Sequence, residues 1–347
     1  MTSNPLPWRS SRLDGCTLTG GLSVTTEVTD GVTIIHGPAG CSQHNASLIH
    51  ATLLDHDTPH LLRIHSSNLD EAGVIFGGEG ALAACIREAA EVDPSVIFVL
   101  STCVVQTIGD DVSGVCRRDW GVPVIPVPSS GFLGGGFQDG MRNALIALGD
   151  LSGEGGDRDG GITLVGEKNL EDDVEENFGE VSRLLALLDE KVRLRFVRGI
   201  RGADIQEISR GRLNILREPE LQAVGDSFAA RFGTPYIGSF PVGLSGSLRF
   251  IEETAGFLGL DPAGALEGER AFQQEALLGF EDLIGERVMV SPFPGSGAPE
   301  FYTADLAASL HLRLADDGVP LPLPSPLPVG TGGLVRLLHR WRRVLHA

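Results

Sequence analysis

The stretch Ser95-Val-Ile-Phe-Val-Leu100, which continues as Ser101-Thr-Cys103, decides the fold class. It is almost uniformly apolar, and such a run is typical of a parallel strand with both faces buried. Three more short runs share this character, namely Val32–His36, Gly73–Phe76 and Val122–Val127. Each is followed by a turn of Gly, Pro, Ser or Thr and then by a helical pattern. This alternation predicts an α/β fold with doubly wound parallel sheets.

The segment Asp150–Gly161 is rich in Gly, Asp and Ser and is the best candidate for a linker. Beyond it, a second sheet is expected from the apolar runs Ile162–Gly166, Val192–Val197 and Leu213–Leu216. We therefore predict Rossmann-like subdomains at residues 1–150 and 151–255. A third, at 256–347, would hold a proline-rich tract in polyproline II conformation at 320–328 and a basic C-terminal helix.

The composition is typical of a folded protein, because 42% of the 347 residues are hydrophobic and 21% are charged. The formal net charge of −19 repels phosphate backbones and anionic headgroups, so neither nucleic acid nor membrane surfaces are expected partners. No apolar run is long enough to span a membrane, and residues 1–12 lack the apolar core of a signal peptide. These features predict a cytoplasmic protein.

The chain has five cysteines and no CxxC pair, which disfavours a disulfide framework and a zinc ribbon. Cys41 and Cys103 each follow a predicted strand, where ligands gather in open α/β sheets. Cys16 lies in a glycine-containing turn, and thiolates are soft ligands suited to iron–sulfur clusters. From spacing alone, small buried side chains in turns are an equally good interpretation of these three. Cys85 and Cys116 fall in helical patterns and are interpreted as structural.

Five motifs in a fixed order resemble those of nitrogenase component 1 and its relatives. They are Gly15-Cys16, His36-Gly-Pro-Ala-Gly-Cys41, Phe76-Gly-Gly78, Ser101-Thr-Cys103-Val-Val-Gln-Thr-Ile-Gly-Asp-Asp111 and Gly131-Phe-Leu-Gly-Gly-Gly136. Each motif alone is weak, but their order and the gaps of 25 and 62 residues between successive cysteines are specific. Val165-Gly-Glu-Lys-Asn-Leu170 also looks like the strand that opens the family's second subdomain. The likeness covers most of residues 10–255.

The resemblance implies a nitrogenase component 1-like fold whose first subdomain binds a 4Fe–4S cluster. The family's ligands carry over onto Cys16, Cys41 and Cys103. Electrons would come from an iron–sulfur reductase that hydrolyses ATP, so the partner and not this chain would use ATP. Three thiolates leave the cluster one ligand short, and a homodimer with the cluster at its interface would supply the rest. No cysteine follows Cys116, so molybdenum-type nitrogenase activity is not expected.

Within the family, the chain most resembles component D of the methanogen reductive cyclases that act on Ni-sirohydrochlorin a,c-diamide. The short chain, the missing later cysteine and Gly233-Thr-Pro-Tyr-Ile-Gly-Ser-Phe-Pro-Val-Gly-Leu244 carry this resemblance. It implies an oxidoreductase that reduces and cyclises a nickel tetrapyrrole in the biosynthesis of coenzyme F-430, used in methanogenesis. Two alternatives are a nitrogenase-like reductase of another small molecule and a non-enzymatic scaffold for metallocluster assembly.

Eight cations face only two acids between Lys191 and Arg217. Guanidinium groups bind carboxylates bidentately, and an anionic tetrapyrrole carries several carboxylates. The candidates for substrate binding are Arg193, Arg195, Arg198 and Arg201. The alternative is a solvated face that balances the acidic surface.

Six of the nine histidines lie between His36 and His65. Their spacing gives no supported metal motif, so most are expected to be capping or surface residues. His36 and His44 flank Cys41, and these two are the candidates for catalytic proton donors near the cluster.

Overall fold

The computed structural model describes residues 9–59, 61–132, 134–153, 160–292 and 300–346. These residues form two compact units. The cysteine unit consists of the described parts of Ser11–Asp172 together with Arg193–Tyr236. The C-terminal unit contains Asp173–Val192 and the described parts of Met1–Ser10 and Ile237–Ala347. No helix in these ranges is long and apolar enough to cross a bilayer.

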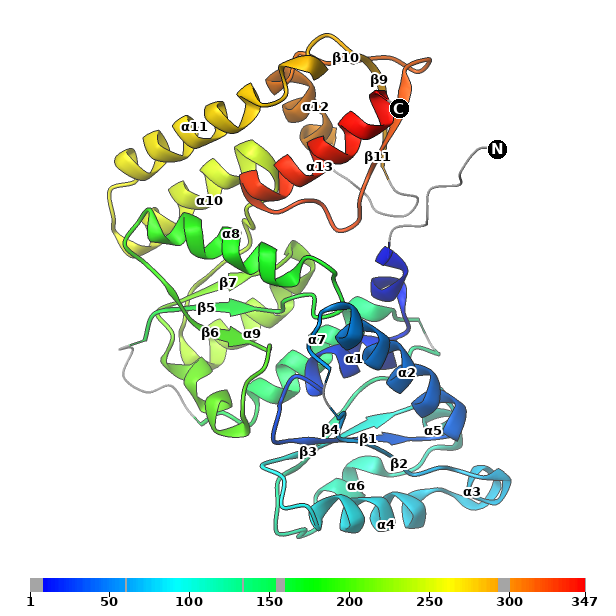
Figure 1. Cartoon of the computed structure of the whole chain (residues 1–347). Coiled ribbons are helices and arrows are strands. Elements are labelled where there is room, and N and C mark those ends of the chain that lie inside the picture. Colours follow the sequence, from blue (N-terminus) through cyan, green and yellow to red (C-terminus); the bar gives the residue numbers. More distant parts are fainter. Residues whose placement is uncertain (1–8, 60, 133, 154–159, 293–299, 347) are drawn as a thin grey trace. The chain divides into compact units, whose positions relative to one another are not determined.

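The first sheet of the cysteine unit has four parallel strands in the order β2-β1-β3-β4. The strands are β1 (Val32–His36), β2 (Ile64–Ser66), β3 (Ile97–Ser101) and β4 (Val124–Val127). The helices around it are α1 (Thr17–Thr25), α2 (Ala39–Asp55), α3 (Glu71–Phe76), α4 (Glu79–Ala90), α5 (Cys103–Ile108), α6 (Val112–Cys116) and α7 (Phe137–Gly149), and a 3-10 helix (Arg9–Asp14) precedes them. In Figure 1, α4 and α6 lie on one face of the sheet and α1 and α7 on the other.

Both faces of this sheet are buried, as the apolar strand patterns predict. Ile97 and Val99 of β3 pack in the core beneath α4 and α6. Phe98 and Leu100 point the other way, into the core shared with α1 and α7. The strands predicted at Val32–His36, 95–100 and 122–127 are therefore confirmed, with small shifts of their ends.

The strand predicted at Gly73–Phe76 is wrong, because these residues belong to α3. The Asp70 side chain caps this helix by accepting a hydrogen bond from the backbone N–H of Gly73 at 2.8 Å. The chain leaves the helix at Gly77, whose φ of 98° favours glycine. The place beside β1 is taken by β2 instead. The helix cap at Asp70 therefore decides the local structure, although the apolar run alone favours a strand.

The second sheet of the cysteine unit has the order β6-β5-β7-β8, and β5 and β7 are parallel. Its elements are β5 (Ile162–Val165), β6 (Val192–Phe196), β7 (Leu213–Leu216), β8 (Tyr236–Ile237), α9 (Gln222–Phe232) and the 3-10 helices Gly202–Arg210 and Pro219–Leu221. The three predicted strands are confirmed. Phe196 and Phe228 meet edge to face at 5.7 Å, in the same core as Leu100. The two sheets therefore share one hydrophobic core.

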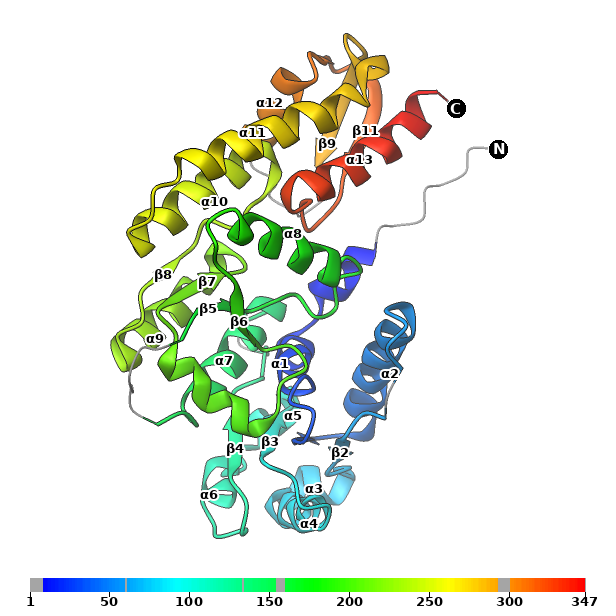
Figure 2. The same ribbon diagram turned by 60° about the vertical axis from the view of Figure 1, so that its left-hand side comes forward.

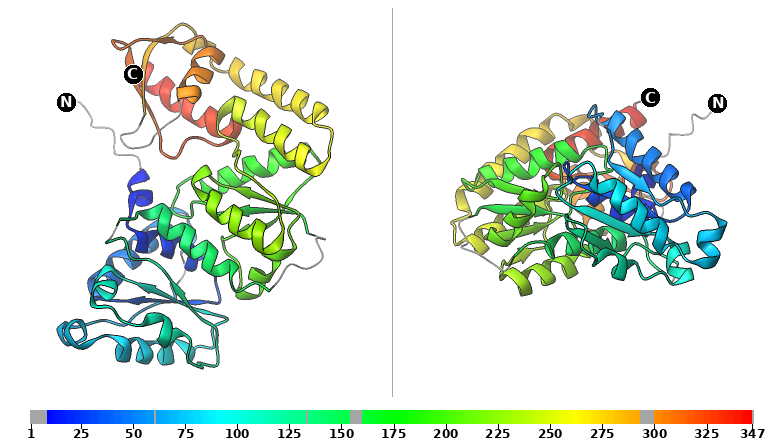
Figure 3. Two further views of the ribbon diagram at one scale, coloured as in Figure 1. Left: turned by 180° about the vertical axis from the view of Figure 1, so that it is seen from behind. Right: turned by 90° about the horizontal axis from the view of Figure 1, so that it is seen from below.

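The C-terminal unit surrounds a small parallel sheet in the order β10-β9-β11. Its elements are α8 (Val174–Ala186), α10 (Gly243–Leu258), α11 (Ala263–Leu278), a 3-10 helix (Glu281–Leu283), β9 (Arg287–Pro292), α12 (Glu300–Ser309), β10 (Arg313–Leu314), β11 (Val319–Leu323) and α13 (Gly330–Leu345). Figures 2 and 3 show α10 beside α11, and α13 runs close to both. The predicted basic helix is confirmed as α13.

The polyproline II prediction is wrong for residues 319–323, which form strand β11. Pro320 and Pro322 alternate with Leu321 and Leu323, whose side chains are fully buried. Because β11 is an edge strand, the missing N–H groups of the prolines cost no ladder hydrogen bond. The Trp341 indole N–H donates to the Pro322 carbonyl at 3.1 Å.

The three sheets occupy residues 32–127, 162–237 and 287–323. The subdomain boundaries expected near residues 150 and 255 stay predictions. The expected linker Asp150–Gly161 lies partly outside the described residues.

Candidate functional site

The three candidate cysteines all lie in the first turn of a helix. Cys16 is the N-cap of α1, Cys41 is in the first turn of α2, and Cys103 is the first residue of α5. β1 leads into α2 and β3 leads into α5, so Cys41 and Cys103 lie beyond the carboxyl ends of neighbouring strands. The Cys16 side chain is exposed, whereas those of Cys41 and Cys103 are partly buried.

Close backbone packing between α1 and α7 fixes the start of α1. A Cβ atom at Gly20 would lie 1.8 Å from the Phe137 carbonyl oxygen, and one at Gly140 would lie 1.8 Å from the Thr17 carbonyl oxygen. No side chain fits at either contact, so both glycines are required for this approach. The turn that presents Cys16 therefore has a rigid support.

The Cys41 thiol interacts electrostatically with both other candidate thiols. Burial raises the pKa of the Cys41 thiol, and the negative charges of Cys16 and Cys103 raise it further. Each thiolate thus opposes ionisation of the Cys41 thiol. A bound cationic group would relieve this repulsion, because a metal that coordinates a thiol deprotonates it.

Cys85 and Cys116 behave differently. Both are buried in the core beneath the first sheet, and burial raises the pKa of each thiol to about 12. Core side chains enclose both thiols, so neither faces a ligand that binds at the edge of the sheet. This arrangement agrees with their interpretation as structural cysteines.

Within the described ranges, no three His, Cys, Asp or Glu side chains converge closely enough to hold one metal ion. A polynuclear iron–sulfur cluster differs from a single ion, because each thiolate binds a different iron atom. Its ligands therefore stand farther apart than those of a mononuclear site. The cysteine arrangement argues against a mononuclear centre and is compatible with a cluster.

Two buried hydroxyls beside the cysteines also fit a sulfur-rich group. Thr17 Oγ1 and Thr102 Oγ1 are buried and have no hydrogen-bond partner among the described residues. Thr17 follows Cys16 directly, and Thr102 precedes Cys103. A Cβ atom at Gly131 would lie 2.6 Å from Thr17 Oγ1, so glycine keeps the space beside this hydroxyl open. Unsatisfied hydroxyl donors next to thiols suit a group with sulfur acceptors.

The ring of His36 is fully buried, and both of its nitrogens have partners. Nδ1 lies 2.8 Å from Ser67 Oγ, and Nε2 lies 3.1 Å from Asp110 Oδ2. Asp110 also accepts from the Gly78 N–H at 3.0 Å. Burial lowers the pKa of His36, and Asp110 partly offsets this effect. A neutral ring with Nε2–H facing the carboxylate satisfies every contact, so His36 joins the end of β1 to the loop after α5.

His44 lies one turn beyond Cys41 on α2, and its side chain is exposed. Of the two predicted proton donors, His44 is the one that solvent reaches. The catalytic roles of His36 and His44 stay predictions.

The four candidate arginines contact acids of their own chain. Arg195 forms a bidentate pair with buried Glu167, with Nε–Oε2 and Nη2–Oε1 both at 2.7 Å. Arg193 pairs with Glu207. Arg198 lies 3.3 Å from Asn169 Oδ1 and 4.0 Å from Glu27, and the exposed Arg201 lies 3.4 Å from Asp30. The structure brings these cations to internal carboxylates, and their role in substrate binding stays a prediction.

Large apolar side chains are exposed in the segments that follow β2 and β4. Ile75 and Phe76 in α3 are 72% and 86% exposed, and Phe132, which follows β4, is 73% exposed. The sequence analysis missed the exposure of Ile75 and Phe76 because it placed both residues in a buried strand.

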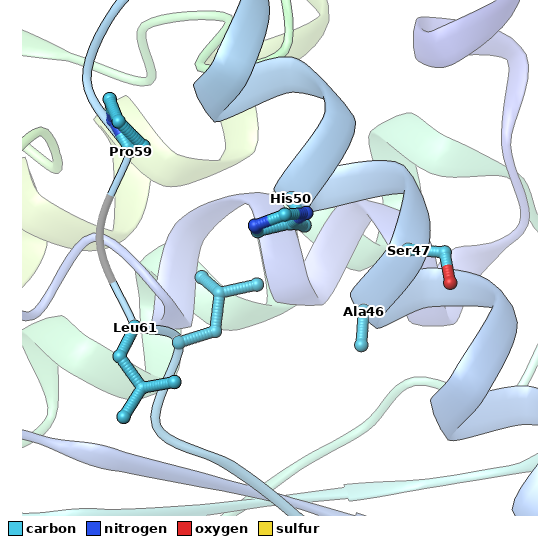
Figure 4. Close-up of a pocket in the computed structure, with 6 residues that line it drawn as sticks. Ala46, Ser47, His50, Pro59 and Leu61 are labelled. Atoms are coloured by element: carbon cyan, nitrogen blue, oxygen red, sulfur yellow. The ribbon is translucent and has the colours of Figure 1, made fainter.

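An open cavity of about 550 Å³ lies along α2, beyond His44. Figure 4 shows Ala46, Ser47 and His50 on α2 across from Pro59 and Leu61. Among the described residues of the lining, His50 is the one ionisable side chain, and none of the three candidate cysteines belongs to it.

Comparison with known proteins gives a consistent result. Residues 16–297 match the family described as nitrogenase component 1 type oxidoreductase. The nitrogenase iron-molybdenum cofactor biosynthesis protein NifE of Clostridium pasteurianum is 31% identical over 251 residues, which are 70% of this chain and 54% of that protein. NifE of Methanosarcina barkeri is 38% identical over 137 residues, which are 38% of this chain and 29% of that protein. The chain spans about half the length of the first of these relatives.

Solved nitrogenase structures share the fold. The structure described as "Nitrogenase Cp1 at pH 5" superposes with a TM-score of 0.68 at 22% identity, over 90% of this chain and 65% of that chain. A second, "Nitrogenase Cp1 at pH 6.5", gives 0.67 at 21% identity, over 93% and 63%. This similarity confirms the predicted α/β architecture with parallel sheets.

Proposed function

Because the chain belongs to the nitrogenase component 1 type oxidoreductase family, we propose that Cys16, Cys41 and Cys103 bind an iron–sulfur cluster that serves a reductive reaction. The observation that carries this proposal is the electrostatic proximity of three thiols in the first turns of three helices. When bound, such a cluster supplies one-electron transfer. The N-termini of α1 and α2 place partial positive charge near this group, which suits negatively charged ligands.

The chain's own residues hold and shield the group. Cys16, Cys41 and Cys103 would hold the iron through their thiolates. The hydroxyls of Thr17 and Thr102 are buried and lack other partners among the described residues, so hydrogen bonds to sulfur would satisfy them. Soft thiolate donors and hydroxyl donors together match an iron–sulfur group.

A second copy of the chain covers the cluster in this proposal. A 4Fe–4S cluster takes four thiolates, and one chain offers three at this edge. The exposed side chains of Ile75, Phe76 and Phe132 provide apolar area for the contact. In the homodimer, both chains supply ligands, so cluster binding stabilises assembly.

The electron donor in this proposal is an ATP-hydrolysing iron–sulfur reductase, and the substrate is an anionic nickel tetrapyrrole that is reduced and cyclised towards coenzyme F-430. The internal ion pairs restrict how arginines bind such a substrate. Displacing Glu167 from Arg195 costs free energy because a buried carboxylate loses its bidentate partner. Arg201 is 73% exposed, so a substrate carboxylate can replace Asp30 there at little cost. Arg201 is therefore the candidate whose internal partner a substrate carboxylate displaces most easily.

A second candidate function is a scaffold on which a metallocluster is assembled. The names of the curated relatives favour it, since they are cofactor biosynthesis proteins. Turnover of a tetrapyrrole with a reductase partner would support the catalytic function. Transfer of an assembled cluster to an acceptor protein, without turnover, would support the scaffold.

The test of the cluster is anaerobic purification with iron and sulfide analysis. We expect Cys16→Ala, Cys41→Ala and Cys103→Ala to lose most of the iron and the visible charge-transfer band. Cys85→Ala and Cys116→Ala are matched controls, because both thiols lie in the core and should leave iron unchanged. Full iron content in all of the first three variants would refute the site. Binding of nickel against magnesium tetrapyrroles to the intact protein then tests the substrate.

A further inference from the structure

Thr19 links the two helices that carry Cys16 and Cys41. Its side chain is 3% exposed, and Thr19 Oγ1 donates to Asn45 Oδ1 of α2 at 2.7 Å. Asn45, also 3% exposed, donates through Nδ2 to the Cys41 carbonyl at 2.8 Å. At its other side, Thr19 Oγ1 lies 3.5 Å from Cys16 Sγ. A continuous chain of contacts therefore runs from the Cys16 sulfur to the backbone of Cys41.

The donor directions in this chain follow from its chemistry. A backbone carbonyl only accepts, so the Asn45 amide must turn its Nδ2 to Cys41 and its Oδ1 to Thr19. Thr19 then donates its single hydroxyl proton to Asn45. The protonated Cys16 thiol can donate to a lone pair of Thr19 Oγ1. The network is complete only while Cys16 has a proton.

Coordination of Cys16 to iron changes this balance. The sulfur then has no proton and becomes an acceptor with negative charge. Two acceptors, Asn45 Oδ1 and Cys16 Sγ, compete for one hydroxyl proton. A hydrogen bond to a charged acceptor is the stronger of the two.

The local backbone keeps Thr19 in this position. A Cβ atom at Gly15 would lie 2.8 Å from Thr19 Cβ and 3.0 Å from Thr19 Oγ1. The side chain of Thr19 thus fills the space that any larger residue at Gly15 would take, immediately beside Cys16.

We propose that Thr19 is a positioning residue of the cluster, whose hydroxyl turns from Asn45 to the sulfur of Cys16 and tunes the reduction potential there. The inference rests on the proposed cluster function. A hydrogen bond to a ligand sulfur stabilises the more negative, reduced cluster and raises its potential. Asn45 opposes this effect because it competes for the same proton.

The experiment measures iron content, midpoint potential and the visible charge-transfer band of anaerobically purified full-length variants. Thr19→Val keeps the shape and removes the hydroxyl, so we expect full iron, a more negative potential and a shifted band. Thr19→Ser should restore the wild-type values. Thr26→Val is the matched control, because its hydroxyl donates to the Leu22 carbonyl in the same helix at 2.7 Å.

Asn45→Ala should not lower the midpoint potential, in contrast to Thr19→Val. Removing the competing acceptor should leave the potential at or above the wild-type value, with no further effect in a Thr19→Val background. A more negative potential in Asn45→Ala would overturn the proposal, because loss of helix alignment would then explain both variants.

The remaining outcomes are also decisive. Full iron with a wild-type potential and band in Thr19→Val refutes the inference and leaves the cluster function standing. If Thr19→Val folds but loses iron, retention in Thr19→Ser supports the inference and loss in both overturns it. A wild-type protein that binds no iron refutes the proposed function, and this inference falls with it.

Discussion

Replacing His36 by Gln removes a titratable group from the most buried polar contact near the cysteines and keeps a donor for Asp110. Burial lowers the pKa of His36 in the native protein below its ordinary value of 6.5. Below pH 6.5 the unfolded chain therefore binds a proton more readily than the native chain. This contribution to stability is present above pH 6.5 and is lost as the pH falls towards the native pKa.

The size of the effect follows from one proton. A single histidine changes the free energy of unfolding by at most about 1.4 kcal/mol per pH unit. Loss of the Ser67 contact adds a penalty of about 0.5–1.5 kcal/mol that does not depend on pH. The pH-dependent slope from the histidine and the pH-independent loss from the Ser67 contact can therefore be measured separately.

The assay is urea unfolding of wild type, His36→Gln and His44→Gln between pH 5 and pH 8. We expect the pH slope of His36→Gln to be smaller than that of wild type below pH 6.5. His44 is exposed, so His44→Gln should keep the wild-type slope. Equal slopes in wild type and His36→Gln would refute the account of a buried, neutral His36.

Three further predictions concern the thiols, the C-terminal unit and the dimer. In iron-free protein at pH 8, iodoacetamide should label exposed Cys16 fastest and leave Cys85 and Cys116 unlabelled, because burial raises the pKa of the latter two thiols to about 12. Peptide mass spectrometry measures the labelling, and fast labelling of Cys85 would contradict this prediction. Glu269→Gln should lower the free energy of unfolding by about 2–4 kcal/mol, since the buried carboxylate accepts from Arg183 at 2.6 Å and from Thr331 at 2.7 Å. The exposed Asp317→Asn is its control in urea unfolding and should change little. Iron-free protein should dissociate at a higher concentration than iron-loaded protein in sedimentation velocity, and identical dissociation would argue for a cluster held within one chain.

Much of the fold was predictable because each buried strand is a short, continuously apolar run in the sequence. β3 is apolar on both faces since helices cover both, and no turn residue interrupts it. The errors at α3 and β11 have local causes. One N-cap, Asp70, outweighed an apolar run, and prolines were tolerated in β11 because it is an edge strand.

The candidate site was also only partly predictable from the sequence. The cysteines could be identified from their place in turns and from the family resemblance. Their supporting contacts could not, because the partners are far apart in the sequence. Arg195 meets Glu167 across 28 residues, and Arg201 meets Asp30 across 171. Only the packed sheets bring such pairs together, so a cluster of cations in the sequence says little about which charges stay available.

The position of the thiols follows from the parallel direction of the strands. In a parallel sheet every strand ends at the same edge, so the turns that follow β1 and β3 deliver Cys41 and Cys103 side by side. α1 runs back before β1, which returns its start, and Cys16 with it, to that edge. Thiolates gathered in this way raise the pKa of Cys41. The fold accepts this repulsion at one point while it supplies two longer helix N-termini, of α1 and α2, that favour negative charge there. In the proposed function, the positively charged core of an iron–sulfur cluster would offset this repulsion, which gives three thiols gathered at one edge of the sheet a role.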